Sequence, residues 1–368
     1  MPPALHDKYL TIKCDNAEAL ALGTRMIVSR APLRVSFFGG GTDYPSYFLR
    51  NGGAVLGSAI DQFSFITASK FRSKGMFDYN IRVTYREIEL VSDLLQLKHV
   101  PIREALKCCG FDRDIEIHHI ADLPAKTGLG SSSSFVVALL HALSHLSGRS
   151  VSPMELAYEA IRFERRTLGE SVGCQDQTFA AIGGFNMLEF RKEDDIVVHP
   201  ITIGDDALEN LESHLMMFYT GIERRAEDIV KTQLTSLPAN HERYKRMRNQ
   251  VDRAYEILTG SGPMEAFGEL LDEAWREKRG LHSVISNPLI DRMYAKAKGS
   301  GALGGKLLGA GAGGFLLLFV PRERQALVEA ALQDYCLVRP RLGAPGSTII
   351  FDGVKARAPM DVQRRAVS

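Results

Sequence analysis

PAKTGLGSSSS, at residues 124–134, sets small residues immediately before an apolar run. That run, residues 135–146, contains neither glycine nor proline and is typical of a buried helix. A loop of this kind can bring successive backbone N–H groups onto a phosphate, and the N-terminus of the helix adds a favourable dipole. The G-K-[ST] ending of a Walker A loop is missing. The plainer alternative is a turn at Gly128 and Gly130 with a serine that caps the helix.

A second glycine-rich segment, RAPLRVSFFGGGTDYPSYF at residues 30–48, joins a strand-like run to a triple glycine. The run contains Arg34, and Asp43 follows the glycines. Glycines at positions 39–41 let a polyhydroxylated ligand come close to the backbone, and Asp43 can accept hydrogen bonds from neighbouring hydroxyl groups. The alternative is a hairpin turn that carries an exposed acid.

The third glycine-rich segment, GALGGKLLGAGAGGF at residues 301–315, leads directly into a strongly apolar strand. A flexible connector is one interpretation of so many glycines. The apolar strand that follows favours the other, a tightly turned loop that packs against a second loop.

Two carboxylates have the placement expected of functional groups. Glu164 interrupts the apolar stripe of a helix expected over residues 153–168. A buried carboxylate is unfavourable unless it is paired or binds a metal, so Glu164 is a candidate Mg²⁺ ligand; the alternative is an ion pair with Arg72 or Arg103. Asp176, between two glutamines, can take the proton of an attacking hydroxyl, or it can simply cap a helix.

Composition limits the class of protein. The chain has 368 residues, 45% of them hydrophobic and 24% charged, as in a globular protein of two domains. Since 45 Lys and Arg balance 44 Asp and Glu, no overall field attracts nucleic acid or an anionic membrane. The five cysteines show no CxxC spacing, and neither a secretory leader nor a run of eighteen apolar residues is present. We therefore expect a cytoplasmic protein.

The order of patterns along the chain predicts its organisation. Residues 1–25 are expected to be an N-terminal extension, residues 26–200 one domain and residues 201–368 another, with the boundary in the charged stretch 191–206. The first domain is expected to be rich in strands. These are expected at residues 26–38, either as two short strands or as one bulged edge strand broken by Pro32, and at residues 54–60, 63–71, 81–85 and 115–119.

Taken together, the three glycine-rich segments resemble the motifs of the GHMP kinases, the family of galactokinase, homoserine kinase, mevalonate kinase and phosphomevalonate kinase. RAPLRVSFFGGGTD, PAKTGLGSSSS and KLLGAGAGGF occur in the family's order, and the likeness spans about residues 26–320. The resemblance implies an α+β fold with an N-terminal domain like the second domain of ribosomal protein S5 and a ferredoxin-like C-terminal domain. It also implies an ATP-dependent phosphotransferase that uses Mg²⁺.

The resemblance assigns an expected role to each matched residue. ATP is expected to contact Lys126, Gly128, Leu129, Gly130, Ser131, Ser132, Ser133, Ser134 and Gly311. Mg²⁺ is expected at Glu164 and at the hydroxyl of Ser132 or Ser131. Asp176 and Arg34 are the expected catalytic residues. The acceptor is expected to lie against Gly40, Gly41, Thr42, Asp43, Gly173 and Tyr219. Two residues depart from the family pattern, since Lys126 stands where glycine is usual and Ala312 interrupts the third glycine run.

Within the family, GGGTDYPSYF, TGLGSSSSF, CQDQ and YTGIERRAEDI are similar to the branch that acts on heptose phosphates. This likeness implies phosphorylation of the anomeric hydroxyl of D-glycero-D-manno-heptose 7-phosphate to the 1,7-bisphosphate, toward nucleotide-activated heptose. A sugar phosphate needs a second anion site, for which we expect Arg224 and Arg225. The alternatives are a kinase for another sugar, such as fucose, galactose or a different sugar phosphate, and a non-catalytic sensor of sugar and ATP. A homodimer remains open.

Overall fold

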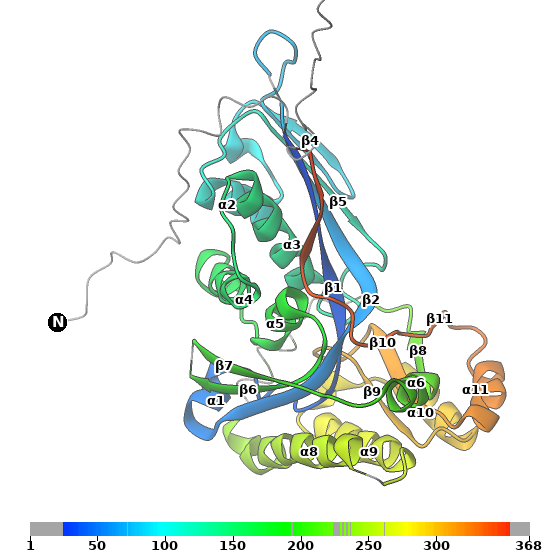
Figure 1. The fold of residues 1–368 in the computed structure, drawn as a ribbon. Coiled ribbons are helices and arrows are strands. Elements are labelled where there is room, and N and C mark those ends of the chain that lie inside the picture. The colour runs from blue at the N-terminus through cyan, green and yellow to red at the C-terminus, as the bar shows by residue number, and fades with distance from the viewer. Residues whose placement is uncertain are drawn as a thin grey trace, which may run out of the picture.

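The computed structural model describes residues 25–353, except residues 72, 193, 224–228, 230, 231, 233, 234, 236 and 261. In this part of the chain, eight strands form a long sheet and four form a short one. Figure 1 shows the long sheet in the upper part of the molecule, and the short sheet with most of the later helices at its lower end. Helices and strands are mixed along the chain, so the expected α+β class is confirmed.

The long sheet has the strand order β12-β1-β2-β5-β3-β4, and β6 pairs with both β2 and β7. Its strands are β1 (Met26–Phe38), β2 (Gly53–Lys70), β3 (Ile81–Thr84), β4 (Ile88–Val91), β5 (Ile115–Ala121), β6 (Phe185–Lys192), β7 (Asp195–Pro200) and β12 (Thr348–Asp352). Strand β12 pairs antiparallel with β1, with Ile27 opposite Asp352, so the chain returns to its first strand. The division into domains after residue 200 stays a prediction; it falls between β7 and the next helix.

Strands β1 and β2 differ from the expected pattern in two ways. β1 is one continuous strand with a register shift between Pro32 and Arg34, and β12 and β2 cover it on both sides over residues 27–30, so it is not an edge strand there. The two strands expected at residues 54–60 and 63–71 are the single strand β2. One edge of β2 pairs with β1, with an irregularity at Pro32. The other edge pairs with β6 over residues 53–58 and with β5 over residues 64–70, so β2 runs unbroken through the residues between them.

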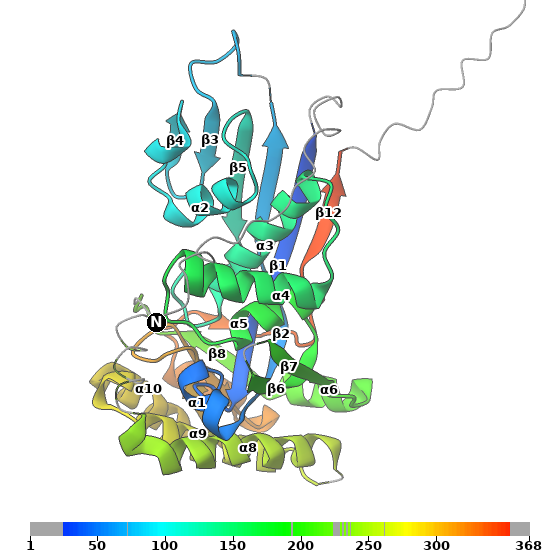
Figure 2. The ribbon, with the colours of Figure 1, turned by 90° about the vertical axis from the view of Figure 1, so that its left-hand side faces the viewer.

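One face of the long sheet is covered by helices, which Figure 2 shows in front of the strands. They are α2 (Val100–Cys108), α3 (Ser131–Leu146), α4 (Pro153–Arg162) and α5 (Gln175–Ile182). Helix α3 is apolar on most sides because it contacts β1 and β2 on one side and α4 and α5 on the other. It begins four residues before the predicted start. The helix expected over residues 153–168 is α4 followed by a π-helical turn, Phe163–Thr167. Gly169, just after it, has a left-handed conformation with φ 73°.

The short sheet is antiparallel, with the order β11-β8-β10-β9. Its strands are β8 (Leu215–Tyr219), β9 (Gly304–Leu307), β10 (Phe315–Phe319) and β11 (Leu337–Val338). The remaining helices are α1 (Pro45–Asn51), α6 (Asp205–Ser213), α8 (His241–Thr259), α9 (Glu265–Arg279), α10 (Pro288–Gly299) and α11 (Gln325–Ala331). Trp275 of α9 is fully buried in a core that it shares with Leu316 and Leu318 of β10.

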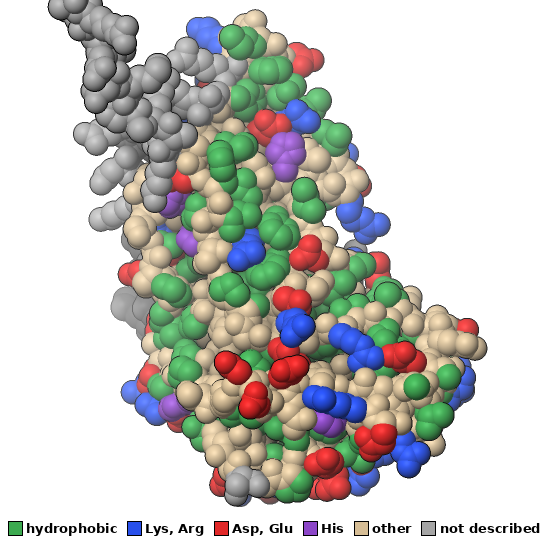
Figure 3. Space-filling view, turned by 45° about the vertical axis from the view of Figure 1, so that its right-hand side comes forward, with side chains coloured by type: hydrophobic (Ala, Val, Ile, Leu, Met, Phe, Trp, Pro, Cys, Tyr) green, Lys and Arg blue, Asp and Glu red, His purple; other side chains and the backbone are tan. Residues whose placement is uncertain are grey.

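On the face that Figure 3 shows, acidic and basic side chains are interspersed over the lower part of the molecule. This distribution agrees with the near balance of 45 basic and 44 acidic residues in the sequence. Across the described residues, none of the helices combines the length and the apolar character that crossing a lipid bilayer requires.

Candidate functional site

The glycine-rich segments at residues 124–134 and 301–315 pack against each other. A Cβ atom on Gly128 would lie 2.5 Å from the carbonyl oxygen of Leu308, and one on Gly309 would lie 2.5 Å from the Cα atom of Gly128. A Cβ atom on Gly314 would lie 2.2 Å from the carbonyl oxygen of Thr127. Two backbones can approach this closely only without side chains, so the prediction of a packed loop is confirmed. Gly311 instead packs against Ile285.

The loop at residues 124–130 leads into α3 without a side-chain cap. Gly130 is the N-cap residue in a left-handed conformation, and no side chain of the described residues accepts a hydrogen bond from the first turn. The alternative of a capping serine is therefore wrong. The side chain of Leu129 is buried and its carbonyl accepts a hydrogen bond of 3.0 Å from the Arg34 backbone N–H, so Leu129 could meet a ligand only through its main chain. Free N–H groups at a helix start are suited to bind an anion.

The four serines after Gly130 form the first turn of α3 rather than a loop before it. Ser132 is exposed and Ser131 is half-buried. Ser134 is buried and donates a hydrogen bond of 2.8 Å to the carbonyl oxygen of Ala31, which ties α3 to β1. The serines therefore point in different directions, as successive residues of a helix must.

The two departures from the glycine pattern share one backbone feature. Lys126 has φ 63° and Ala312 has φ 65°, both in the left-handed region that glycine adopts without strain. Lys126 is exposed, whereas Ala312 is fully buried and its N–H donates to the carbonyl oxygen of Ile285 at 2.7 Å. The chain thus keeps the backbone geometry of a glycine-rich loop at both positions.

Arg34 and Asp176 form a bidentate ion pair beside the loop at residues 124–130, the candidate phosphate-binding loop. The Nε and Nη2 atoms of Arg34 each donate to one carboxylate oxygen at 2.9 Å, and Nη1 donates to the carbonyl oxygen of Gly128 at 2.6 Å. Asp176 lies in the first turn of α5, and the N-cap residue is Cys174, so the alternative of a helix-capping Asp176 is wrong. A Cβ atom on Gly130 would be 3.2 Å from Oδ2 of Asp176, which places this carboxylate at the start of α3.

Glu164 is fully buried and has polar partners but no cationic one among the described residues. The hydroxyl of Ser133 lies 3.0 Å from both of its carboxylate oxygens, and the amide nitrogen of Gln177 donates to one of them. Burial raises the pKa of Glu164 to about 8. Of the two arginines considered as partners, Arg103 pairs with Glu104, and Arg72 lies outside the described residues.

The groups around Glu164 fit a magnesium ion by their chemistry. Besides the carboxylate, they offer the hydroxyl of Ser133 and the amide oxygen of Gln177, which is buried and has no hydrogen-bond partner. Mg²⁺ takes oxygen ligands, usually one or two carboxylates together with water and substrate phosphates. No group of three or more His, Cys, Asp or Glu side chains suited to a metal occurs in the described chain. The hydroxyl that lies beside Glu164 belongs to Ser133, and the role of Ser132 stays a prediction.

Asp43 is a fully buried carboxylate at the N-terminus of α5, so the alternative of an exposed acid is wrong. Its Oδ2 atom accepts hydrogen bonds from the backbone N–H groups of Cys174 at 3.1 Å and Gln175 at 3.2 Å. Burial raises the pKa of Asp43. Gly173 makes this position possible, because a Cβ atom there would lie 1.9 Å from Oδ2 of Asp43. Gly41, at φ 102°, donates its N–H to Oδ1 at 3.0 Å.

The other residues expected at the acceptor differ in what their side chains can do. The hydroxyl of Thr42 lies 2.8 Å from the backbone carbonyl oxygens of both Gly39 and Ala54, which compete for its single proton, and it accepts from the N–H of Ala54, so it holds the loop. Tyr219 ends β8, where its ring lies 5.4 Å from that of Phe315. Arg224 and Arg225 lie outside the described residues.

Two polar side chains beside Gly40 belong to the site but were not singled out from the sequence. Ser36 is 5% exposed and Gln175 is 9% exposed, and Ser36 Oγ and Gln175 Oε1 are buried without a hydrogen-bond partner. A Cβ atom on Gly40 would be 3.3 Å from Ser36 Oγ and 3.8 Å from Gln175 Nε2. Buried polar atoms without partners are rare, so this region is suited to a ligand that supplies hydroxyl groups. The available signal was Ser36 itself, a small polar residue between Val35 and two phenylalanines in the strand-like run LRVSFF.

Two buried lysines, also not singled out, lie behind the glycine loops. Lys278 of α9 donates from Nζ to the carbonyl oxygens of Gly309 and, at 3.2 Å, Leu307. Lys306 of β9 donates to the carbonyl oxygen of Phe37 at 2.8 Å. Burial, with a smaller effect of the nearby positive charge of Arg34, lowers the pKa of Lys278 to about 7.

Comparison of the sequence with known families gives two matches. Residues 97–184 match the GHMP kinases N terminal domain, and residues 250–337 match the GHMP kinases C terminal domain. D-glycero-alpha-D-manno-heptose 7-phosphate kinase of Campylobacter jejuni is 30% identical to this chain over 321 residues, which cover 84% of this chain and 94% of that protein. Galactokinase of Pyrococcus furiosus is 25% identical over 345 residues, which cover 84% and 93%.

Solved structures have the same fold. A structure described as a D-glycero-D-manno-heptose 1-phosphate kinase of Bacteroides thetaiotaomicron superposes with a TM-score of 0.71 at 24% identity, covering 88% of this chain and 97% of that one. Galactokinase of Lactococcus lactis in complex with galactose gives 0.67 at 19% identity, covering 91% and 96%. At these identities the likeness concerns the fold, and it confirms the architecture expected from the three motifs.

Proposed function

Because the chain belongs to the GHMP kinase family and is an ATP-dependent sugar kinase, we propose that it phosphorylates the anomeric hydroxyl of D-glycero-D-manno-heptose 7-phosphate. The product would be the 1,7-bisphosphate, an intermediate toward nucleotide-activated heptose. The observation that carries this proposal is the 30% identity, over 94% of its length, to a relative named for that substrate.

The phosphates of ATP are proposed to bind at the N-terminus of α3. Gly130 caps this helix without a side chain, so its first N–H groups and the helix dipole are available to an anion. Mg²⁺, held by Glu164 with the hydroxyl of Ser133 or Ser132, would neutralise charge on the transferred phosphoryl group. Exposed Lys126 adds a positive charge beside this loop.

Asp176 is proposed to orient the anomeric hydroxyl and accept its proton. The bidentate pair with Arg34, at 2.9 Å for each contact, fixes the direction of the carboxylate and keeps it beside the phosphate loop. Positioning of the acceptor contributes much of the catalysis in phosphoryl transfer, and a general base contributes about 10²–10⁴-fold. Asp43, Ser36 and Gln175 would bind the other sugar hydroxyls through the carboxylate and the two unpartnered oxygens.

The phosphate already present on the sugar is proposed to bind Arg224 and Arg225, since the guanidinium group of arginine can donate two parallel hydrogen bonds to a phosphate. Replacing both by alanine should raise KM for the heptose phosphate at least about tenfold and leave KM for unphosphorylated heptose unchanged. An unchanged KM for the phosphorylated sugar would contradict this assignment.

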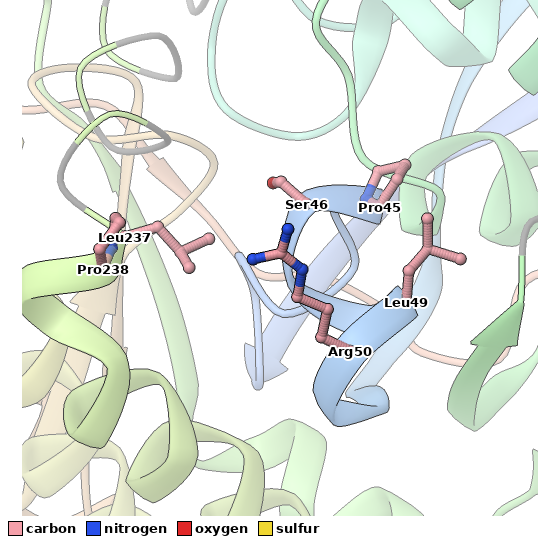
Figure 4. Close-up of a pocket in the computed structure, with 6 residues that line it drawn as sticks. All are labelled: Pro45, Ser46, Leu49, Arg50, Leu237 and Pro238. Carbon is pink, nitrogen blue, oxygen red and sulfur yellow. The ribbon is translucent and has the colours of Figure 1, made fainter.

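Arg50 provides a control for the substitution of Arg224 and Arg225. It is the one charged residue lining a surface hollow of about 370 Å³ beside α1, close in sequence to Asp43, and Figure 4 shows its guanidinium group extending along this hollow. The hollow is lined by Pro45, Ser46, Leu49, Arg50, Leu237 and Pro238. Arg50→Ala should leave KM for the heptose phosphate unchanged, and a rise confined to this variant would move the second anion site to the hollow.

The proposal is tested by ADP release with MgATP and a panel of acceptors. The panel contains D-glycero-D-manno-heptose 7-phosphate, the corresponding 1-phosphate, sedoheptulose 7-phosphate, mannose 6-phosphate, fucose, galactose and mevalonate. The 1-phosphate is included because the structural relative is named for it. The highest kcat/KM is expected for the 7-phosphate; a preference for fucose or galactose would keep the family and refute the acceptor, and no turnover with any acceptor would favour a sensor.

A further inference from the structure

Three buried cations converge behind the loops that are proposed to bind ATP. Arg34, Lys278 and Lys306 are only 5%, 7% and 5% exposed, and they come from β1, α9 and β9. Besides burial, the positive charge of Arg34 lowers the pKa of both lysines, and that of Lys278 lowers the pKa of Lys306, so the three groups lie close together. Distant parts of the sequence thus build one cluster.

The cluster holds the glycine loops through their carbonyl groups. Arg34 donates to Gly128 at 2.6 Å, Lys278 donates to Gly309, and Gly309 packs against Gly128. Lys306 donates to Phe37 at 2.8 Å, just before the glycines of the acceptor loop. A peptide group whose carbonyl oxygen is fixed by a cation also has its N–H fixed in direction, so these contacts organise the loop backbone.

The charges of this cluster are not balanced. Among the described residues, Asp176, paired with Arg34, is the carboxylate in contact with it. Three cations against one carboxylate leave an excess of two positive charges when both lysines are protonated. Buried cations are unfavourable without counter-charges, so a polyanion on the other side of the loops would stabilise them.

We propose that Lys278 and Lys306 are positioning residues for nucleotide binding. They hold the phosphate and acceptor loops, and the phosphates of ATP balance their positive charge. This inference rests on the proposed location of those phosphates at residues 128–134. The lysines act through the loop backbone and through charge, without direct contact with the substrate. Bound nucleotide must then favour the protonated lysines, and binding must take up protons.

Few ionisable groups around Lys278 can gain or lose a proton together with it. Arg34 from β1 stays charged, Lys306 from β9 is a second amine whose pKa burial lowers well below its ordinary value, and Asp176 from α5 reaches the cluster through Arg34. The loop at residues 308–315 carries no ionisable side chain. On α9 itself, Asp272 is engaged by Tyr294 and Arg276 instead.

The test measures proton uptake when the ATP analogue AMPPNP binds with Mg²⁺. Calorimetric titrations in two buffers of different ionisation enthalpy give the number of protons. With a pKa of about 7 for Lys278 in the free protein, wild type should take up about half a proton at this group at pH 7 and slightly more at pH 8. Lys278→Arg keeps a permanent charge, so its uptake should be smaller by these amounts, and the contribution of the nucleotide itself cancels in the difference.

Affinity gives a second readout. Lys278→Gln keeps a donor but removes the charge, and should bind AMPPNP roughly tenfold more weakly than wild type at pH 7, with the difference shrinking as the pH rises. The matched control is Lys298→Gln, since Lys298 also donates to a loop carbonyl, that of Leu303 at 2.6 Å, but lies beside Asp272. This variant should change neither readout.

Equal proton uptake by wild type and Lys278→Arg would overturn the inference, as would equal losses of affinity in Lys278→Gln and Lys298→Gln. If Lys278→Gln does not fold, the comparison of wild type with Lys278→Arg still decides. The titrations contain no sugar, so their outcome is independent of the assigned acceptor.

Discussion

Asp176→Asn is the substitution whose consequences the site geometry defines most fully. It keeps the size of the side chain but removes the charge that balances Arg34, and it turns one of two acceptors at 2.9 Å into a donor facing a guanidinium group. Removing one partner of a buried ion pair costs about 3–5 kcal/mol; because the Asp176 side chain is 27% exposed, we expect about 3 kcal/mol. We expect kcat to fall about 10²–10⁴-fold.

Nucleotide affinity separates a catalytic role from a general loss of structure. The substitution removes a negative charge from the region proposed to bind phosphates, so the Kd for MgATP should stay equal or become tighter. The assays are urea unfolding, calorimetric ATP binding, and ADP release with saturating acceptor.

The matched control is Asp272→Asn, which removes the charge of another buried carboxylate, whose partners Arg276, Lys298 and Tyr294 are not among the site residues. It should lower the free energy of unfolding by a similar amount and leave kcat unchanged. A kcat of Asp176→Asn within about threefold of wild type would refute the assignment of Asp176 as base. Equal losses of kcat in the two variants would show that destabilisation, rather than chemistry, is responsible.

Three further predictions concern single positions. In Gly173→Ala the new Cβ atom would lie 1.9 Å from Asp43 Oδ2, so urea unfolding should show a loss of about 2–3 kcal/mol, and KM for the acceptor should rise. Ala312→Gly should raise the free energy of unfolding by about 0.5–1 kcal/mol, because it relieves a left-handed alanine at φ 65°. The pKa of Glu164 is raised from the ordinary 4.5 to about 8, so the folded protein favours the protonated form. The free energy of unfolding of metal-free wild type should therefore fall by a few kcal/mol as the pH rises from 4.5 to 8. Urea unfolding in the presence of EDTA should show this pH dependence in wild type and not in Glu164→Gln.

Two other positions, Gly299 and Ala310, supply the controls for the two loop substitutions. Gly299→Ala adds a Cβ atom in open space within α10 and should be neutral or slightly stabilising. Ala310→Gly removes a Cβ atom at a residue without positive φ, so it should destabilise the protein slightly where Ala312→Gly stabilises it. Effects of the same sign for the two alanines would contradict the explanation by backbone strain, and a neutral Gly173→Ala would contradict the steric role of that glycine.

Local patterns in the sequence were enough for the parts of the site that are continuous along the chain. Gly128 and Gly130 precede an apolar helix, and Glu164 interrupts a helical stripe, so the loop and the buried carboxylate could be predicted. Asp43 and Asp176 could be named from the family motifs.

The rest of the site depends on contacts between distant segments. Lys278 and Lys306 gain their environment only when α9 and β9 pack behind the glycine loops, and Ser36 loses its partners only when β1 is buried. The start of α3 at Ser131 depends on the left-handed conformation of Gly130, at φ 74°, which composition does not specify. Arg224 and Arg225 remain predictions from the motif resemblance.

The most direct test of the proposed reaction is phosphorus NMR of the product formed from D-glycero-D-manno-heptose 7-phosphate and MgATP. We expect a second sugar phosphate signal coupled to the anomeric proton, with the product formed in equal amount to ADP and about 10²–10⁴-fold more slowly by Asp176→Asn. Phosphate on any other hydroxyl, or no new sugar phosphate while another acceptor of the panel is consumed, would contradict it.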